Sequence, residues 1–178
     1  VEACFAEAGI ERITDLQRVP RRDVERMEFI SEVILAAVPA AFFYNPTAAC
    51  LLIFTTLKLA TRNGVYEAMG YPLSVASTPF ILVRNDYRAG YEYAEYAIQI
   101  AANNKRSLGN AKHLFILFCW HWSRPMKDDT ALETARDAHH LLMQGGDIQM
   151  AGYTYYNTVT YLWERGEPLA AVREEALK

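Results

Sequence analysis

Hydrophobic residues recur at intervals of three and four positions along most of this chain, with polar residues between them. Side chains at this spacing share one face of an α-helix, so the pattern predicts helices and no strand. The pattern and its turn signals together predict about eight helices, at approximately 23–38, 46–62, 73–83, 87–102, 107–124, 130–144, 148–163 and 168–178.

Several boundaries carry specific local signals. Asn45, followed by a proline, is a typical helix start, and the carboxylate of Asp86 can cap the helix that follows it. Gly146 suits the left-handed residue that ends a helix. Pro39 is expected to end the first helix, and Pro79 to bend the third, because proline lacks the backbone N–H that a helix interior needs.

Small residues recur at helical spacing in two places. They are Gly90, Ala94 and Ala97, and then Ala131, Ala135 and Ala138, after a shift of 41 residues. Small side chains on one face let a neighbouring helix approach closely. The recurrence of this pattern indicates stacked helix pairs. The predicted fold is therefore all-α, an antiparallel helix-hairpin array with the stacking of an α-solenoid. Residues 1–22 are expected to be the end of a preceding helix and a connector, and residues 23–178 the repeat domain.

Composition narrows the possible functions. The 178 residues are 52% hydrophobic, which argues against disorder, and the net charge of −3 argues against a nucleic-acid partner. Glu32 and Pro39 interrupt the most apolar stretch, so no membrane span is expected. Three unclustered cysteines indicate a reducing, cytoplasmic setting. The chain begins at Val1 rather than Met, and we expect it to be a fragment of a longer protein.

Two resemblances refine the expected fold. The small-residue pattern Asp86-Tyr87-x2-Gly90-x3-Ala94-x2-Ala97, its partial copy Ala131-x3-Ala135-x2-Ala138 and the start Gly166-Glu167-Pro168-Leu169-x-Ala171 resemble the second helix of tetratricopeptide (TPR) repeats. The Trp-Leu-Gly pattern of the first TPR helix is largely absent. The array therefore resembles a degenerate, TPR-like one.

A second resemblance rests on the order of five short motifs. They are Ala40-Ala41-Phe42-Phe43-x-Asn45-Pro46, Asn85-Asp86-Tyr87-x2-Gly90, His121-Trp122-x-Arg124-Pro125, Gly146-Asp147-x3-Ala151-Gly152-Tyr153 and Gly166-Glu167-Pro168-Leu169. In this order they resemble the helical region of large bacterial signalling proteins that join a serine/threonine-kinase-like domain, a STAND-type ATPase, a GAF domain and a histidine kinase. The resemblance implies a regulatory segment, and it brings no catalytic residue because the family's catalytic motifs lie elsewhere.

Catalytic and metal-binding patterns are sparse in the sequence. The phosphate-binding loop G-x-x-x-x-G-K-[ST], H-E-x-x-H and paired C-x-x-C are absent. His113 and His121 lie eight positions apart, too far to share one ion, and Cys119 is not on the helix face of His121. The acidic pairs, Glu92 with Glu95 and Glu174 with Glu175, are expected on solvated helix faces. We therefore predict no metal, no cofactor and no catalytic residue in this segment.

An aromatic face on helix 148–163 is the best candidate for binding. Tyr153, Tyr156, Thr160 and Trp163 follow a three-four-three spacing and share a face. Tyrosine and tryptophan suit binding surfaces because they combine large apolar area with a polar tip. The alternative is that these rings fill the core between repeats.

Two functions follow as hypotheses. The first is a non-catalytic regulatory or sensing module that binds a neighbouring domain, another protein or a small-molecule inducer on a concave helical surface. The second is a structural spacer or self-association segment between catalytic domains, with a possible homodimer. A free-standing enzyme is a weaker third, because no set of residues supports it.

Overall fold

The computed structural model describes residue 6 and residues 12–120 and 130–178, whose regular elements are all helical, with no strand. The predicted all-α class is thus confirmed for the described part of the chain. The α-helices are α2 (Val24–Tyr44), α3 (Pro46–Asn63), α4 (Gly70–Val75), α5 (Ser77–Leu82), α6 (Tyr87–Ile100), α7 (Lys105–Leu114), α9 (Thr130–Gln144), α10 (Ile148–Glu164) and α11 (Leu169–Ala176). Two 3₁₀ turns, η1 (Ile13–Arg18) and η2 (Glu67–Met69), and a π-helical segment, η3 (Phe115–Trp120), complete the described elements.

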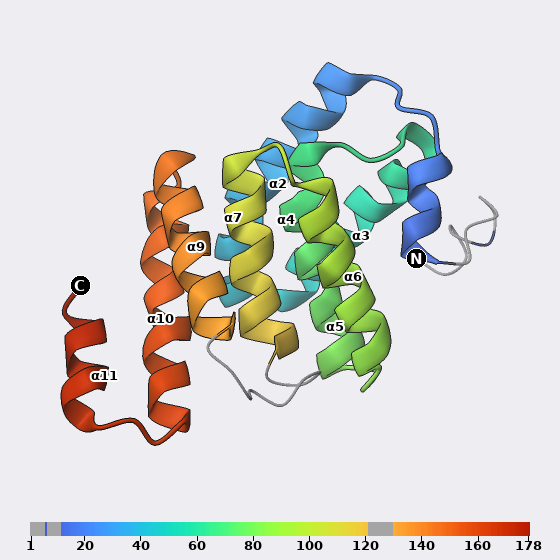
Figure 1. Cartoon of the computed structure of the whole chain (residues 1–178). Helices are drawn as coiled ribbons and strands as arrows, with labels where there is room; N and C mark the ends of the chain where they lie inside the picture. The colour runs from blue at the N-terminus through green and yellow to red at the C-terminus, as the bar shows by residue number, and fades with distance from the viewer. Residues whose placement is uncertain (1–5, 7–11, 121–129) are drawn as a thin grey trace.

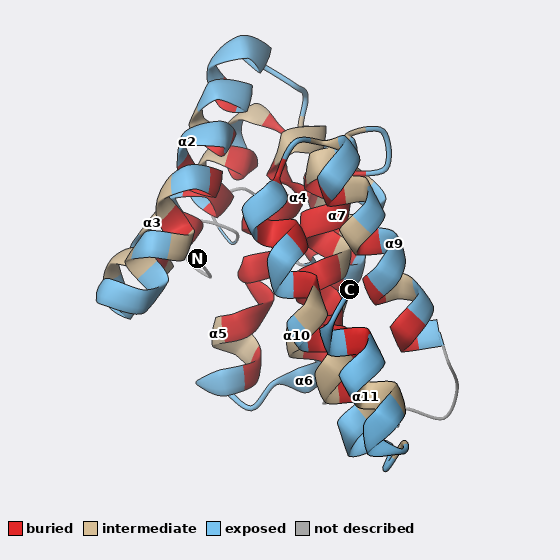
Figure 2. Cartoon of the chain, turned by 90° about the vertical axis from the view of Figure 1, so that its left-hand side faces the viewer, coloured by how far each residue is buried: buried red, intermediate tan, exposed pale blue. Residues whose placement is uncertain are grey.

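Helices that follow one another pack as antiparallel neighbours. Helix α2 packs on α3, α7 on α9, and α9 on α10, with α11 beside α10 at the edge (Figure 1). The buried residues gather where α4 and α7 meet the other helices, whereas the outer faces of α2, α3 and α11 are exposed (Figure 2). All six residues of α4 are buried, so this short helix lies at the centre of the core.

The caps predicted at Asn45 and Asp86 and the helix end predicted at Gly146 are confirmed, whereas Asp23, which the sequence also offers as a cap, makes no capping hydrogen bond through its side chain. The side chain of Asn45 accepts a hydrogen bond from the Ala48 N–H at 3.1 Å, and that of Asp86 accepts one from the Ala89 N–H at 3.0 Å. Gly146 follows α9 in the left-handed region, with φ of 77°. These signals succeed because a cap is formed by residues within three positions of one another.

The expected end of the first helix at Pro39 is wrong. Helix α2 continues through Pro39 to Tyr44 and ends at Asn45. Proline removes one hydrogen bond from a helix and costs about 3 kcal/mol there, so packing must offset that cost. Val38 is buried beside the proline, and the chain beyond it lines a pocket described below.

Two further boundaries differ from expectation. The stretch expected as one bent helix consists of two helices, α4 and α5, separated at Ala76. Helix α4 ends at Val75 because, in a continuous helix, the ring of Pro79 would clash with the carbonyl of Val75. The expected connector before residue 23 contains η1, whose Ile13 and Leu16 are buried. A polar stretch can still contribute to the core through two well-placed apolar residues.

Helix α2 also passes a simple test for membrane helices. It has 21 residues and a mean hydropathy of 1.6 in its most apolar window, of which 28% is buried. The expectation that Pro39 interrupts this stretch fails, since the helix is continuous. A core helix or a signal sequence meets the same criteria of length and composition, so the cytoplasmic setting stays a prediction.

The small residues lie where helices approach closely. Both triplets are buried, Gly90 with Ala94 and Ala97 on α6, and Ala131 with Ala135 and Ala138 on α9. A Cβ on Gly90 would lie 2.4 Å from Cγ1 of Ile81 in α5. Gly109 of α7 was not singled out by the sequence pattern and faces α9, where a Cβ would lie 2.7 Å from Cγ of Leu142. The triplets thus mark close helix contacts, as predicted.

Replacing Gly109 by alanine is expected to destabilise the fold. The new methyl would also meet backbone atoms, the Leu142 nitrogen at 3.0 Å and the Ala138 oxygen at 3.1 Å. Overpacking of this kind typically costs 1–3 kcal/mol, so we expect a loss of about 2 kcal/mol in the free energy of unfolding, measured with urea. Gly152→Ala is the matched control: nothing lies within 4 Å of its added Cβ, so it should gain roughly 0.5–1 kcal/mol from helix propensity. Equal effects of the two substitutions would contradict close packing of α7 on α9.

Candidate functional site

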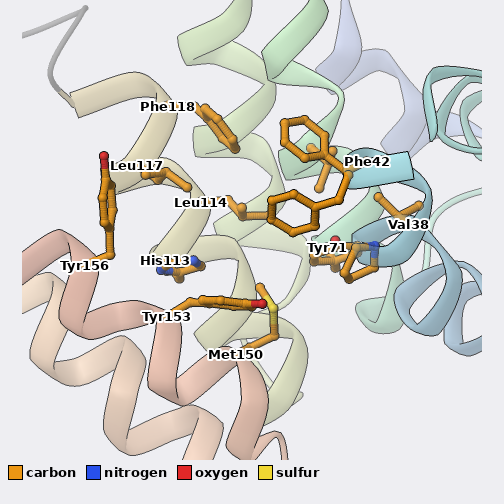
Figure 3. A pocket seen from close by; sticks show the side chains of 13 residues that line it. Val38, Phe42, Tyr71, His113, Leu114, Leu117, Phe118, Met150, Tyr153 and Tyr156 are labelled. Carbon is orange, nitrogen blue, oxygen red and sulfur yellow. The ribbon is translucent and has the colours of Figure 1, made fainter. Parts of the chain in front are cut away.

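An apolar pocket lies between α2 and α10. Its volume is about 180 Å³, and nearly all of its wall is apolar. Helices α2 and α10 form two sides, while α4, α7 and η3 form the rest (Figure 3). The lining residues are Val38, Pro39, Phe42, Phe43, Tyr71, Val75, His113, Leu114, Leu117, Phe118, Met150, Tyr153 and Tyr156.

Helix α10 contributes residues at intervals of three. Met150, Tyr153 and Tyr156 therefore lie along one side of the helix and face the pocket. Met150 is buried, whereas Tyr153 is 41% and Tyr156 62% exposed. The two tyrosines thus form a rim that is open to solvent, and the methionine reaches inward.

Helix α7 and the π segment that continues it supply another wall. His113 with Leu117, and Leu114 with Phe118, are pairs four positions apart, so each pair projects to the same side. π-Helical turns are rare and often occur at functional sites. Here the segment η3 carries the apolar face of α7 onward along the pocket.

Helix α2 closes the opposite side with aromatic rings. Val38 is buried, Phe42 is 40% exposed and Phe43 is 76% exposed. The rings of Phe42 and Phe43 contact each other edge to face, with centroids 5.6 Å apart. This stretch follows Pro39, so the continuation of α2 beyond the proline places both rings at the pocket.

His113 is the one nitrogen-bearing side chain among the residues that line this pocket. The amide Nδ2 of Asn157 donates to its Nδ1 at 2.9 Å and to its backbone oxygen at 3.1 Å. A donor facing Nδ1 requires that nitrogen to be unprotonated, which places the ring proton on Nε2. Burial lowers the pKa of His113 to about 4, although the charge of Asp147 acts in the opposite sense. The ring is therefore neutral at pH 7.

A polar hollow adjoins the apolar pocket. Its volume is about 350 Å³, and Pro39, Phe43, Met150 and Tyr153 line both spaces. Arg106 of α7 and Asp147, the N-cap of α10, also line it. The two spaces together form one groove with an apolar end and a polar end, which we call the α2–α10 groove.

An ion network fixes the polar end of this groove. Nε of Arg106 lies 3.1 Å from Oδ2 of Asp147, and its Nη1 lies 2.6 Å from Oε2 of Glu32 in α2. Nδ2 of Asn110 donates to the same Asp147 oxygen at 3.2 Å. Oδ1 of Asp147 accepts from the Met150 N–H at 3.2 Å. Arg106 therefore links α7 to both α2 and the start of α10.

Only part of the aromatic face predicted from the sequence lies at the pocket. Tyr153 and Tyr156 line the pocket, whereas Thr160 and Trp163 do not. Trp163 is ten positions beyond Tyr153, roughly 15 Å along the helix axis. It is 63% exposed, so the alternative that these rings fill the core does not describe Tyr153, Tyr156 or Trp163. Their role in binding stays a prediction.

Several residues that line the pocket are not indicated as site residues by the sequence pattern. Phe42 and Phe43 belong to one of the short motifs but not to the predicted site, and the sequence suggests no role for His113 other than that of a metal ligand. Tyr71 lies in a stretch without clear periodicity, yet it is buried and lines the pocket. A useful signal was the Phe42-Phe43 pair, because consecutive helical residues cannot both face the core.

The remaining reactive residues have structural surroundings. Cys119 is fully buried, and burial raises the pKa of its thiol to about 11, which disfavours the thiolate. Glu92 forms an exposed ion pair with Arg88. Among the residues that the structure describes, no three His, Cys, Asp or Glu side chains are grouped to hold a metal ion; His121 lies outside them.

The expectation that Glu175 lies on a solvated face is wrong. Its side chain is 4% exposed and pairs with Arg136 and Lys178, each at 2.8 Å. Burial alone would raise the pKa of Glu175, but hydrogen bonds and charge from Arg136 and Lys178 lower it to about 2. The pairing with Arg136 joins α11 to α9 across 39 positions, which periodicity cannot reveal.

Comparison of the chain with protein-family models, curated proteins and solved structures finds no match.

Proposed function

We propose that this chain is a non-catalytic sensing and interaction module that binds a small apolar ligand in the α2–α10 groove. The observation that carries the proposal is an apolar pocket that remains open to solvent through a tyrosine rim. Ligand sites are typically concave and mostly apolar with a few polar groups, and this pocket fits that description. Its apolar wall also favours uncharged ligands, since a charged group would lose its hydration there.

The position of the pocket suggests how binding would act on the rest of a signalling protein. Its two sides come from α2 and α10, which are about a hundred positions apart in the chain. A ligand that contacts both helices stabilises one arrangement of the two, and a different affinity for two arrangements is what a sensor requires. We extend this to a TPR-like superhelical stacking of the helix pairs within a cytoplasmic bacterial signalling ATPase or histidine kinase. Neighbouring domains would respond to the change.

A structural spacer is the second candidate, favoured by the exposed apolar face of α2. Phe29 is 69%, Val33 49% and Tyr44 93% exposed, which provides a surface for self-association or for a neighbouring domain. A spacer needs no ligand. It predicts no change in melting temperature with any compound of a broad small-molecule screen.

Two substitutions on the same helix separate these functions. We expect toluene, a neutral single-ring probe, to raise the melting temperature of the wild-type chain and to bind it in calorimetry. Tyr156→Ala should weaken binding about fivefold to tenfold, because it removes one of the two rings that form the rim of the pocket. Trp163→Ala removes a ring of similar exposure, 63% against 62%, that lies outside the pocket and should leave the affinity unchanged.

Filling the cavity provides an independent test. Leu117→Trp places a larger side chain in the pocket and should abolish toluene binding. Leu162→Trp enlarges another half-buried leucine, which packs on a separate apolar cluster, and serves as its control. Absence of toluene binding to the wild type, or equal loss in Tyr156→Ala and Trp163→Ala, would remove support for the sensing function and favour the spacer.

A further inference from the structure

We infer that the pocket is selective for a neutral, single-ring-sized molecule that carries one hydrogen-bond acceptor, such as a ketone, ester or ether oxygen, and that Nε2–H of His113 donates to this acceptor. This inference rests on the proposed function and specifies the ligand class of the same site.

The hydrogen bonds of His113 leave one donor for a ligand. Asn157 occupies Nδ1, so the proton is on Nε2, as described above. No hydrogen bond joins Nε2 to any residue that the structure describes. Although it has no partner among those residues, Nε2 is not one of the fully buried polar atoms. It therefore contacts open space. Because His113 is 2% exposed and lines the pocket, that space is the cavity, and Figure 3 shows the ring between Tyr153 and Tyr156.

The hydrogen bond to Asn157 also fixes the orientation of the ring. Asn157 is buried, and its Nδ2 contacts two atoms of the same histidine. Exchanging the amide oxygen and nitrogen would place the oxygen against the His113 carbonyl, so the amide orientation is determined by the contact. A donor held in this way is preorganised, which lets a ligand acceptor bind without first ordering the ring.

The remaining wall excludes charged ligands. The other polar side-chain groups at the cavity are the hydroxyls of Tyr71, Tyr153 and Tyr156, and none of them is a cation. Burial and the charge of Asp147 raise the pKa of Tyr71, so its hydroxyl is neutral. Arg106, at the polar end of the groove, is already paired with Glu32 and Asp147. A carboxylate in the apolar pocket would therefore find no free cation among the lining residues and would lose its hydration.

The cavity volume limits the size of the ligand. A cavity of roughly 150 Å³ holds a benzene molecule, and drug-sized ligands occupy roughly 300–1,000 Å³. At about 180 Å³ the pocket has room for one ring with a short substituent. Acetophenone has this size and carries one acceptor, α-methylstyrene has the same shape with no acceptor, and benzoate has the same size with a negative charge.

The experiment compares these three probes on the wild-type chain and on two histidine variants. The more hydrophobic alkene binds apolar sites better for reasons unrelated to His113, so the measured quantity is the ratio of ketone to alkene affinity. His113→Asn keeps an acceptor near the position of Nδ1 for Asn157 and removes the Nε2 donor, so the ratio should fall about tenfold. His113→Gln keeps an amide donor near the position of Nε2 and should retain most of the ratio. Benzoate should bind at least tenfold more weakly than acetophenone.

A second readout needs no substitution. Nitrogen-15 NMR of the imidazole of the wild-type chain should show the Nε2–H tautomer of His113, and acetophenone but not α-methylstyrene should shift the Nε2–H proton downfield. An unchanged ratio in His113→Asn together with no ketone-specific shift would overturn the ligand class while leaving the proposed function intact, provided that the probes still compete with toluene. Tighter binding of benzoate would also overturn it. Failure of all three probes and of toluene would remove the proposed function as well.

Discussion

Replacing Asp147 by alanine is expected to lower the free energy of unfolding by about 3 kcal/mol. The side chain is 9% exposed and has three roles, since it caps α10 through Met150, pairs with Arg106 and accepts from Asn110. Loss of an aspartate cap costs about 1 kcal/mol. Removing one partner of a fully buried ion pair costs roughly 3–5 kcal/mol, but Arg106 is 37% exposed and keeps Glu32, so we expect a smaller contribution of about 2 kcal/mol.

The matched control for this substitution is Asp86→Ala. Asp86 caps α6 with the same geometry, accepting from the Ala89 N–H at 3.0 Å, but the residue is exposed and its side chain makes no other hydrogen bond with the described residues. It should cost about 1 kcal/mol, and Asp147→Asn, which keeps a capping oxygen, should fall between the two. Urea unfolding measures all three variants. A loss in Asp147→Ala no greater than that in Asp86→Ala would show that the network with Arg106 does not stabilise the fold.

Local features of this fold could be predicted from the sequence because the interacting groups are neighbours in the chain. Asn45 and Asp86 cap through atoms three positions away, and the left-handed Gly146 ends α9 with backbone bonds of the same turn. Pro39 shows the limit of this reasoning. Its local preference is to end a helix, yet the packing of Val38 and the residues beyond it carries α2 on to Tyr44.

The candidate site could be predicted only in part. Helical spacing brings Tyr153 and Tyr156 together on α10, and both line the pocket. Spacing along one helix does not show where the facing helices end. The predicted site therefore includes Trp163, although the pocket does not extend that far. The opposite wall comes from Phe42 on α2, and the donor comes from His113 on α7. Contacts between elements so distant in the chain arise from tertiary packing, which a single sequence does not specify.

Acidification is expected to destabilise the wild-type chain through His113. The unfolded histidine has its ordinary pKa of 6.5, and burial in the folded state lowers the pKa of His113 to about 4, against a smaller opposing effect of Asp147. Between these values the unfolded chain binds a proton that the folded chain does not, so stability falls as the pH falls from 6.5 to 4. The shift corresponds to a loss of about 2 kcal/mol by pH 5 and about 3 kcal/mol by pH 4.

His113→Asn isolates this effect from the other titrating groups. The variant has no imidazole at this position but keeps an acceptor for Asn157. The free energy of unfolding of each protein is expressed relative to its own value at pH 7, so that only the pH dependence is compared. The wild type should lose about 2 kcal/mol more than the variant between pH 7 and pH 5, measured by urea unfolding at each pH. Glu175 does not interfere, because its pKa is lowered to about 2 and its contribution is lost below the ordinary value of 4.5. Parallel pH profiles of the two proteins would mean that His113 is protonated or solvated in the folded chain. The same result would remove the neutral donor on which the selectivity of the pocket for an uncharged acceptor depends.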